Sequence, residues 1–343
     1  MAYTTINKST EHFNTVTTTG GAKSITGVGF QPDWIWSKRR DSTSDHHVND
    51  AVRGASKLIY TNATTAEQTN ANFLTSFDSD GFTTGSAYWS SSANIVAWNW
   101  KANGAGSANT DGTINSTVSA NTTSGFSIVS WTGTGANGTI GHGLNSTPQV
   151  VIVKDRSAGF GWLFGHNSLG SWTKNLKLNE TIAVETITST FNSTAPTSSV
   201  FSIGSSGANN GSGNSLIAYC FAEKTGYSKF GSYTGNGNAD GNFIYTGFKP
   251  AFLIVKRYDA GGYFWHMYDN KRSSSGGSNI IDDVLYPQNN HAEYSGDKLD
   301  FVSNGIKYRS ANGDINGSGG SYIYMAFAEA PLVGTNNVPC TAR

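Results

Sequence analysis

Charged residues are scarce in this 343-residue chain, and the two signs balance. Lysine and arginine together number 23, aspartate and glutamate also number 23, and these four types make up only 13% of the chain. Proteins that bind nucleic acids need a basic surface for their phosphate contacts. The composition therefore predicts no nucleic-acid partner, and we interpret the one tight basic run, Lys38 to Arg40, as solvated surface.

Long apolar runs and cysteines are also few. No stretch approaches the roughly 20 apolar residues of a membrane-spanning helix, and the N-terminus lacks the basic and apolar regions of a secretory signal. The two cysteines, Cys220 and Cys340, are too few for a disulfide framework and fit a reducing compartment. We therefore expect a protein that is made in a cytoplasm and is not inserted in a membrane.

The usual enzyme motifs are missing as well. The chain has no Gly-x-Ser-x-Gly turn, no His-Glu-x-x-His pair and no phosphate-binding loop that ends in Gly-Lys-Ser or Gly-Lys-Thr. We predict that the protein is not an enzyme and needs no cofactor. Two carboxylates that the fold brings together leave no local motif, so a polysaccharide-degrading enzyme stays as an alternative.

Glycine, asparagine, serine and threonine are abundant instead. The chain has 41 glycines but only 7 prolines, and short apolar runs alternate with clusters of turn-forming residues. This pattern is typical of an all-β protein with many turns. The best candidate for a helix is the stretch 62–72, at one or two turns.

The most apolar stretch of the chain occurs three times. Each copy has a proline, an apolar run and a lysine six residues after the proline, and each is followed later by a second apolar run that ends in an aromatic residue. The prolines are Pro32, Pro148 and Pro250, and the lysines are Lys38, Lys154 and Lys256. We place each lysine at the polar exit of its strand.

This repetition predicts three tandem β-sandwich-like units of about 100–115 residues. Their expected limits are 1–104 for unit one, 105–124 for a small and polar linker, 125–226 for unit two and 227–343 for unit three. The last two units are joined by a very short connection. We therefore expect them to pack as a rigid pair, with the first unit more independent.

Matching positions in the repeats supply the candidate binding residues. Two Asp–Arg pairs follow their prolines at similar distances, and so do two tryptophans. The residues are Asp50 with Arg53, Asp269 with Arg272, Trp162 and Trp265. Each pair is either a local ion pair in a loop or part of a polar binding edge. The tryptophans are either core residues or exposed platforms on which sugar rings stack.

Two further clusters resemble the start of a metal site. His46 and His47 are adjacent, so on a strand they point to opposite faces, and a zinc site needs three or four ligands. Asp78 and Asp80 resemble the start of a calcium loop, but no acidic ligand follows at the required place. We predict a hairpin turn at Asp78 and Asp80 and no metal site at either cluster.

Four longer motifs carry a resemblance to a known family. They are Tyr233-Thr-Gly-Asn-Gly-Asn-Ala-Asp-Gly, Gly247-Phe-Lys-Pro-Ala-Phe-Leu-Ile-Val-Lys-Arg257, Met267-Tyr-Asp-Asn-Lys-Arg272 and Tyr322-Ile-Tyr-Met-Ala-Phe-Ala-Glu329. With them the chain resembles an uncharacterised repeat-domain family of virion proteins of tailed bacteriophages, many from marine hosts. In such phages a similar module often ends a long tail fibre or another structural polypeptide.

The resemblance implies a structural protein on the virion surface. Its expected partners are other virion proteins and the polysaccharides of the host surface, which a tail-associated fibre or receptor-binding protein contacts. A capsid decoration or head-fibre protein is the alternative, since this chain consists of the module alone. Fibres by analogy are homo-oligomers, most often trimers, although three internal units can also provide a threefold arrangement within one chain.

Overall fold

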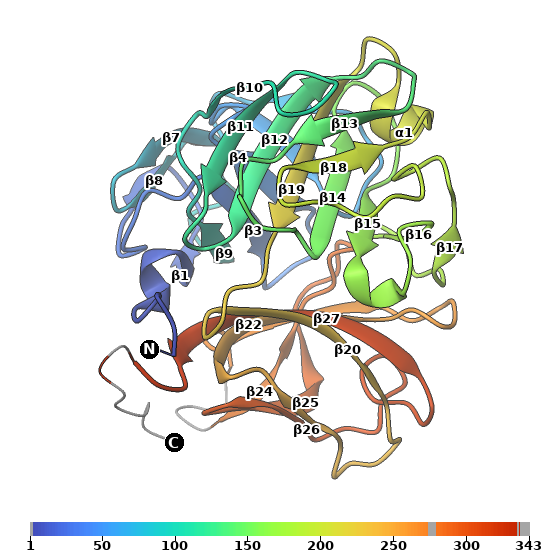
Figure 1. The fold of residues 1–343 in the computed structure, drawn as a ribbon. Coiled ribbons are helices and arrows are strands. Elements are labelled where there is room, and N and C mark those ends of the chain that lie inside the picture. Colours follow the sequence, from blue (N-terminus) through green and yellow to red (C-terminus); the bar gives the residue numbers. More distant parts are fainter. Residues whose placement is uncertain (1–2, 274–278, 335, 337–343) are drawn as a thin grey trace.

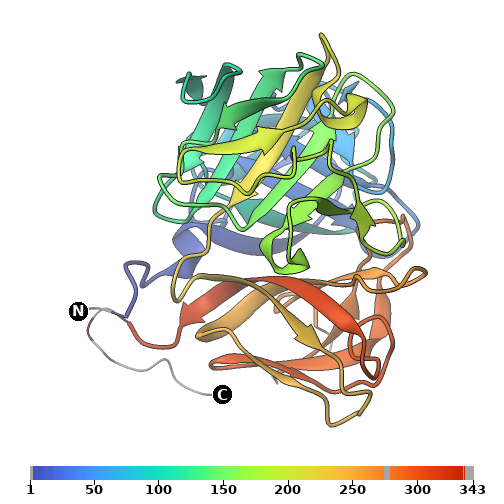
Figure 2. The ribbon, with the colours of Figure 1, turned by 45° about the vertical axis from the view of Figure 1, so that its right-hand side comes forward.

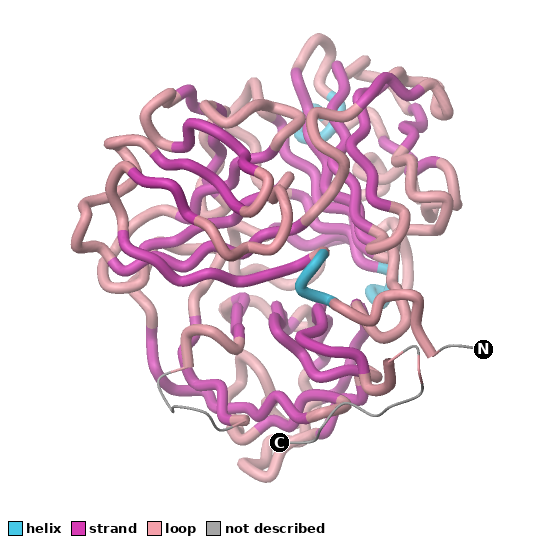
Figure 3. The backbone as a smooth tube through the Cα atoms, turned by 90° about the vertical axis from the view of Figure 1, so that its left-hand side faces the viewer, coloured by secondary structure: helices cyan, strands magenta, loops and turns pink. Residues whose placement is uncertain are grey.

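The computed structural model describes residues 3–273, 279–334 and 336, and this part of the chain is almost entirely β-structure (Figure 1). Neighbouring strands in its sheets run antiparallel, and helices are limited to short pieces, drawn in cyan in Figure 3. The predicted all-β fold class is confirmed. The predicted helix at 62–72 is wrong, because this stretch has no apolar stripe to pack against a core.

The strands fall into three segments along the chain. The first segment holds η1 (Ser9–Glu11), β1 (Phe13–Thr19), β2 (Lys23–Ile25), β3 (Trp34–Arg39), β4 (His46–Asp50), β5 (Lys57–Tyr60), β6 (Gln68–Thr69), β7 (Leu74–Asp78), β8 (Gly81–Thr84) and β9 (Asn94–Trp100). The second holds β10 (Ser107–Asn109), β11 (Ser116–Asn121), β12 (Phe126–Thr132), β13 (Gly138–Gly141), β14 (Val150–Asp155), β15 (Leu163–His166), η2 (Asn167–Leu169), β16 (Lys174–Lys177), β17 (Glu185–Thr186), β18 (Val200–Ile203), α1 (Gly207–Asn210) and β19 (Ser215–Phe221). The third holds β20 (Ser228–Thr234), β21 (Phe243–Tyr245), β22 (Phe248–Arg257), β23 (Trp265–Asp269), β24 (Ile280–Val284), β25 (Tyr294–Val302), β26 (Gly305–Tyr308) and β27 (Ser321–Pro331).

One four-strand order recurs in the large sheet of each segment. The orders are β1-β9-β3-β4, β12-β19-β14-β15 and β20-β27-β22-β23. The registers agree as well, since Trp34 pairs with Trp100, Val150 with Phe221 and Phe252 with Phe327. Positions in one segment therefore have structural equivalents in the other two.

Each large sheet is buried on both faces at its central strands. Its outer face packs on the small sheet of the same segment, which is β2-β8-β7, β13-β18 or β21-β26-β25-β24. Its inner face packs into one core that all three segments share. Side chains alternate along a strand, so Trp34 and Trp36 enter the shared core while Ile35 enters the core of the first segment.

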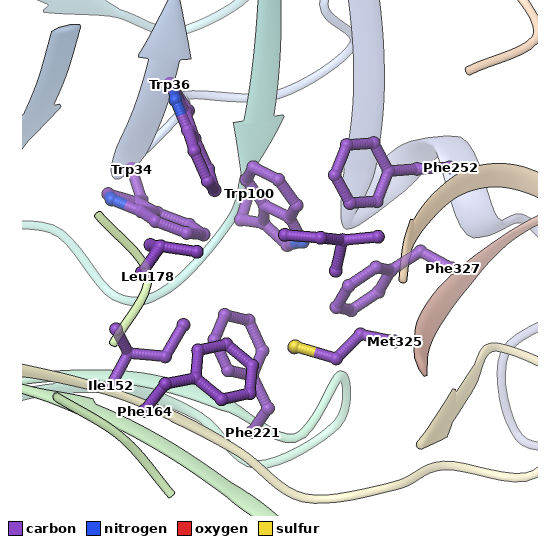
Figure 4. A pocket seen from close by; sticks show the side chains of 11 residues that line it. Trp34, Trp36, Trp100, Ile152, Phe164, Leu178, Phe221, Phe252, Met325 and Phe327 are labelled. Atoms are coloured by element: carbon purple, nitrogen blue, oxygen red, sulfur yellow. The ribbon is translucent and has the colours of Figure 1, made fainter. Parts of the chain in front are cut away.

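The shared core lies where the three segments meet, with the third segment below the other two in Figures 1 and 2. Side chains from all three segments surround an apolar space of about 10 Å³ at its centre (Figure 4). A space of this volume holds about one water-sized probe and is too small for an organic ligand. The expectation that the first segment is more independent is wrong, because Trp34, Trp36 and Trp100 help to build this centre.

The stretch 105–124 is not the linker that its composition suggests. Strand β10 pairs with β11, and β11 pairs with β12, so both strands extend the large sheet of the second segment. Ile114 and Val118 give this polar stretch an apolar face, and both are buried in the core of that segment. The stretch 105–124 is therefore part of the second segment, held by strand pairing and by two buried apolar side chains.

The three repeated lysines are buried, which corrects their placement at a solvated strand end. Lys38, Lys154 and Lys256 are each 0% exposed. Each Nζ donates at 2.6 Å to the backbone carbonyl of the next residue, and to a second carbonyl in the loop that follows. Burial lowers the pKa of each to about 8. The lysine repeats because it holds together the turn between the central strand and the next one.

Cys220 is buried in β19, and burial raises the pKa of its thiol. Cys340 lies outside the described residues. None of the helices in the described part of the chain has the length and hydropathy needed to cross a bilayer.

Candidate functional site

Trp162 and Trp265, the predicted sugar platforms, lie in the shared core. Each is only 1% exposed. Trp162 Nε1 donates at 2.8 Å to the carbonyl of Tyr60 in the first segment, and Trp265 Nε1 donates at 3.1 Å to the carbonyl of Lys177 in the second. The platform prediction is wrong because both positions face a neighbouring segment, and the alternative of core packing is the correct one.

The first Asp–Arg pair lies at the junction of the first and second segments. Arg53 Nε donates to Asp50 Oδ2 at 2.5 Å, and both side chains are fully buried. The hydroxyl of Tyr219, in the second segment, donates to the same carboxylate oxygen at 2.7 Å. Glu67 then accepts from Arg53 at 3.2 Å and from Arg156 of the second segment at 2.8 Å. This network joins two segments.

The second Asp–Arg pair repeats the network at the junction of the third and first segments. Arg272 Nε donates to Asp269 Oδ2 at 2.5 Å, and Trp98 Nε1 of the first segment donates to the same oxygen at 2.9 Å. Glu293 accepts from Arg272 at 2.7 Å and from Arg40 at 2.6 Å. The predicted binding edge is therefore wrong, since burial between segments leaves these groups no room for a partner.

The junction of the second and third segments has the same positions without the charges. His166 takes the place of the two aspartates, and its Nε2 lies 3.3 Å from the carbonyl oxygen of Tyr324. Leu169 stands three residues later, where the other segments have arginine, and is buried in the shared core. Val184 takes the place of the glutamate, and Tyr258 takes the place of the arginine. Val184 N donates to the carbonyl of Tyr258 at 2.8 Å, as the backbone N–H of the glutamate does to the carbonyl of the arginine at the other junctions.

His46 and His47 point to opposite faces of their sheet, as their adjacency predicts. His46 is buried, and its Nδ1 accepts from Trp36 Nε1 at 3.1 Å. The ring of His47 lies against Trp89 on the outer face. Among the described residues, no group of three His, Cys, Asp or Glu side chains is arranged to hold a metal ion.

Asp78 and Asp80 lie in the hairpin between β7 and β8, where the sequence predicts a turn. The carboxylate of Asp78 accepts from the hydroxyls of Ser76 and Thr83, both at 2.7 Å. Asp80 accepts from the backbone N–H of Gly29 at 2.7 Å. These carboxylates thus satisfy donors of the turn and of a neighbouring loop.

An aromatic pocket in the first segment is the strongest candidate for a functional site. It is a cavity of about 290 Å³. Strands β4, β5 and β6 and the loops on either side of the β7–β8 hairpin supply its lining. The lining residues are His47, Leu58, Tyr60, Gln68, Thr69, Asn70, Phe73, Ala87 and Trp89.

Stacked rings form one side of this aromatic pocket. The ring of His47 lies parallel to that of Trp89, with 4.7 Å between centroids and 9° between planes. Phe73 meets the same imidazole edge-on at 4.3 Å, and Tyr60 lies 4.9 Å from it. Burial lowers the pKa of His47 to about 3, so its ring is neutral at pH 7. The wall of rings is therefore aromatic and uncharged, and its parallel pair is His47 and Trp89.

Trp89 is held in an unusual backbone conformation. Its φ is +48°, in the left-handed region that a bulky residue seldom adopts. Such a conformation costs on the order of 1–3 kcal/mol and clusters at functional sites. Its Nε1 donates to Ser44 Oγ at 2.7 Å, which fixes the indole while leaving the side chain partly exposed.

The rim of the aromatic pocket is polar. Gln68 and Thr69 are exposed, Asn70 is partly buried, and their amides and hydroxyl both donate and accept hydrogen bonds. Lys57 Nζ donates to Thr69 Oγ1 at 2.7 Å. The described residues of the lining include no aspartate or glutamate, so they offer no carboxylate pair for hydrolysis. Flat rings beside amides suit a ligand with an apolar face and hydroxyl groups, as a sugar has.

Sequence reasoning did not find this pocket. Its rings come from positions far apart in the chain, and only the adjacency of His46 and His47 drew attention to one of them. A weak signal was present in Tyr88 and Trp89, two neighbouring aromatic residues within a serine-rich stretch that the other two repeats lack.

Comparisons with known proteins give a family but no activity. A search of curated proteins and a search of solved structures each found no match. One family model, described as a domain of unknown function (DUF7483), matches residues 8–331. That match covers nearly the whole chain, which therefore belongs to the DUF7483 family.

Proposed function

We propose that this protein binds glycans of the host surface as a non-enzymatic virion protein of a tailed bacteriophage. In this proposal it is a tail-associated fibre or receptor-binding component. The single observation that carries the glycan part is the aromatic pocket, with its wall of stacked rings and its amide and hydroxyl rim. The virion part rests on the resemblance of the sequence motifs.

The chemistry of the aromatic pocket favours a sugar over other small ligands. A pyranose ring has one face of C–H groups, which packs on an aromatic ring, and an equator of hydroxyls, which need partners that both donate and accept. Trp89 offers the ring, and Gln68 and Asn70 offer such partners. A cavity of about 290 Å³ takes one or two sugar residues of a longer chain. We expect weak binding per site, with a Kd near 1 mM, strengthened by many copies on one particle.

The test is binding of the purified full chain to polysaccharide isolated from the host surface. Trp89→Ala removes the stacked ring, and we expect it to weaken binding at least tenfold. Tyr294→Ala is the matched control, because Tyr294 is 53% exposed on β25 of the third segment and does not line the aromatic pocket. Equal loss in both variants, or no loss in either, would contradict the proposal.

The alternative of a capsid decoration or head-fibre protein predicts a different place in the particle. Decoration requires many tens of copies over the head, whereas a tail component is present in a few copies. Labelling of the protein in images of whole virions separates the two. Release of reducing ends from the polysaccharide would instead support the polysaccharide-degrading alternative.

We further propose that a single chain is the functional unit, in place of the trimer expected by analogy. A trimeric fibre obtains its threefold arrangement from three chains, and here three segments of one chain surround one core. Measurement of the mass in solution tests this, because a stable trimer would contradict it.

A further inference from the structure

One serine connects the aromatic pocket with the third segment. Ser44 lies in the loop between β3 and β4, and its Oγ accepts from Trp89 Nε1 at 2.7 Å. Its backbone N–H donates at 2.8 Å to the carbonyl of Asn290 in the third segment. The residue that holds the indole of the aromatic pocket is therefore itself held by a neighbouring segment.

A second hydrogen bond ties another side of the aromatic pocket to the same loop of the third segment. Thr61 directly follows Tyr60, which ends β5 and lines the pocket. Thr61 is 1% exposed, and its Oγ1 donates at 2.9 Å to the carbonyl of Pro287. The loop 287–290 thus supports both the Trp89 side and the Tyr60 side of the pocket.

Trp89 depends on such support because its backbone lies in the left-handed region. A bulky residue stays in that region only where its surroundings fix it. The indole has a single hydrogen-bond donor, Nε1, and Ser44 Oγ accepts from it. The ring packs parallel to His47 and edge-on to Phe73 and Tyr88. Packed rings can slide or tilt, whereas a hydrogen bond at 2.7 Å sets the direction of the indole.

We propose that Ser44 is a positioning residue that couples glycan binding in the aromatic pocket to the contact between the first and third segments. The inference rests on the proposed function, because it concerns the same pocket and the same ligand, the host polysaccharide. Ser44 is not among the lining residues, so it acts through Trp89. It holds the indole in place before the sugar arrives, and a ring that is already in its bound position loses less conformational freedom on binding.

The coupling acts in both directions. A sugar stacked on Trp89 restrains the indole and Ser44 with it, so the hydrogen bond from Ser44 N to Asn290 should open less often when the ligand is bound. A serine that only stabilises the fold would not respond to the ligand in this way. Hydrogen exchange of the Ser44 amide therefore separates a positioning role from a merely structural one.

Ser44→Ala removes the hydroxyl and keeps the backbone bond to Asn290. We expect it to weaken binding of the purified full chain to host polysaccharide about three- to tenfold, as the loss of one hydrogen bond would. Ser44→Thr restores the hydroxyl and should bind within about twofold of the wild type. Ser42→Ala is the matched control in the same loop and should bind like the wild type, because Ser42 contributes its backbone carbonyl, which accepts from Lys38 Nζ at 3.4 Å.

Two further measurements, on variants that melting curves show to be folded, test the link to the third segment. Host polysaccharide should slow the hydrogen exchange of the amide of residue 44 in the wild type, and should slow it much less in Ser44→Ala. Thr61→Val keeps the shape of a side chain outside the pocket lining and removes its bond to Pro287. It should therefore weaken polysaccharide binding as well.

Unchanged binding by Ser44→Ala or by Thr61→Val overturns the inference. Binding by Ser44→Thr that is as weak as that of Ser44→Ala overturns it too, as does exchange at residue 44 that polysaccharide leaves unchanged in the wild type. In each of these cases, loss of binding in Trp89→Ala leaves the proposed function standing. Absence of polysaccharide binding by the wild type removes both proposals.

Discussion

Replacing Arg53 alone is expected to destabilise the protein more than replacing its whole network. The carboxylate of Asp50 is fully buried and depends on Arg53, which bonds it at 2.5 Å. In Arg53→Leu this carboxylate keeps the hydroxyl of Tyr219 but loses its counter-charge. Removing one member of a buried ion pair costs about 3–5 kcal/mol.

That loss is large compared with the free energy of unfolding of an ordinary protein, which is about 5–15 kcal/mol. The junction of the second and third segments shows how it can be avoided, because His166, Leu169, Val184 and Tyr258 occupy the same places there. A fourfold variant with Asp50→His, Arg53→Leu, Glu67→Val and Arg156→Tyr has no buried charge to compensate. We expect its free energy of unfolding to equal that of the wild type or to exceed it by about 1–4 kcal/mol.

Urea denaturation of the full chain, followed by tryptophan fluorescence, measures these differences. Arg39→Leu is the control, because Arg39 and Asp41 form a 2.6 Å ion pair whose side chains are 29% and 31% exposed. Such surface pairs contribute less than about 1 kcal/mol. The reasoning would be refuted by an Arg53→Leu variant as stable as Arg39→Leu, or by a fourfold variant less stable than the single one.

Two more predictions concern the core and the lysines. Phe327 packs against rings from all three segments, among them Phe13 and Phe221. In the same urea assay, Phe327→Ala should therefore lower the free energy of unfolding by about 3–5 kcal/mol. Phe243 is exposed, so Phe243→Ala should change it little. Lys154 has its pKa lowered by burial from 10.5 to about 8. Between these values the unfolded chain keeps a proton that the folded chain has released, so stability should rise as the pH increases from about 8 to about 10. Lys154→Met should reduce that slope, and an unchanged slope would contradict the assignment.

Sequence reasoning reached the fold class because β-structure leaves local marks. Alternating or continuous apolar runs between glycine and asparagine turns are visible without knowing any contact. The repeated proline and lysine also marked equivalent central strands, as the shared strand order of the three large sheets shows. Burial of the lysines was missed because a strand end followed by Arg39 looks solvated, and only the loop that folds over Lys38 hides it.

The candidate sites were harder to predict because they depend on contacts between segments. Asp50, Arg53 and Trp162 have counterparts in another unit because they form contacts between segments. In the sequence, a polar or aromatic residue that repeats for packing looks the same as one that repeats for ligand binding. The choice between them is made by the packing of one segment on the next. No spacing within a single unit contains that information.

Equivalent positions show why the aromatic pocket belongs to the first segment alone. His47, Leu163 and His266 stand at the same register, opposite the fifth residue after the repeated proline. Leu163 is buried in the core of its segment, and His266 Nε2 lies 3.3 Å from Asp297 Oδ2. His47, in contrast, stacks its ring in the wall of an accessible cavity, beside Trp89 with its left-handed backbone. The positions that repeat hold the three segments together, so a ligand-binding role is expected where equivalent positions have diverged.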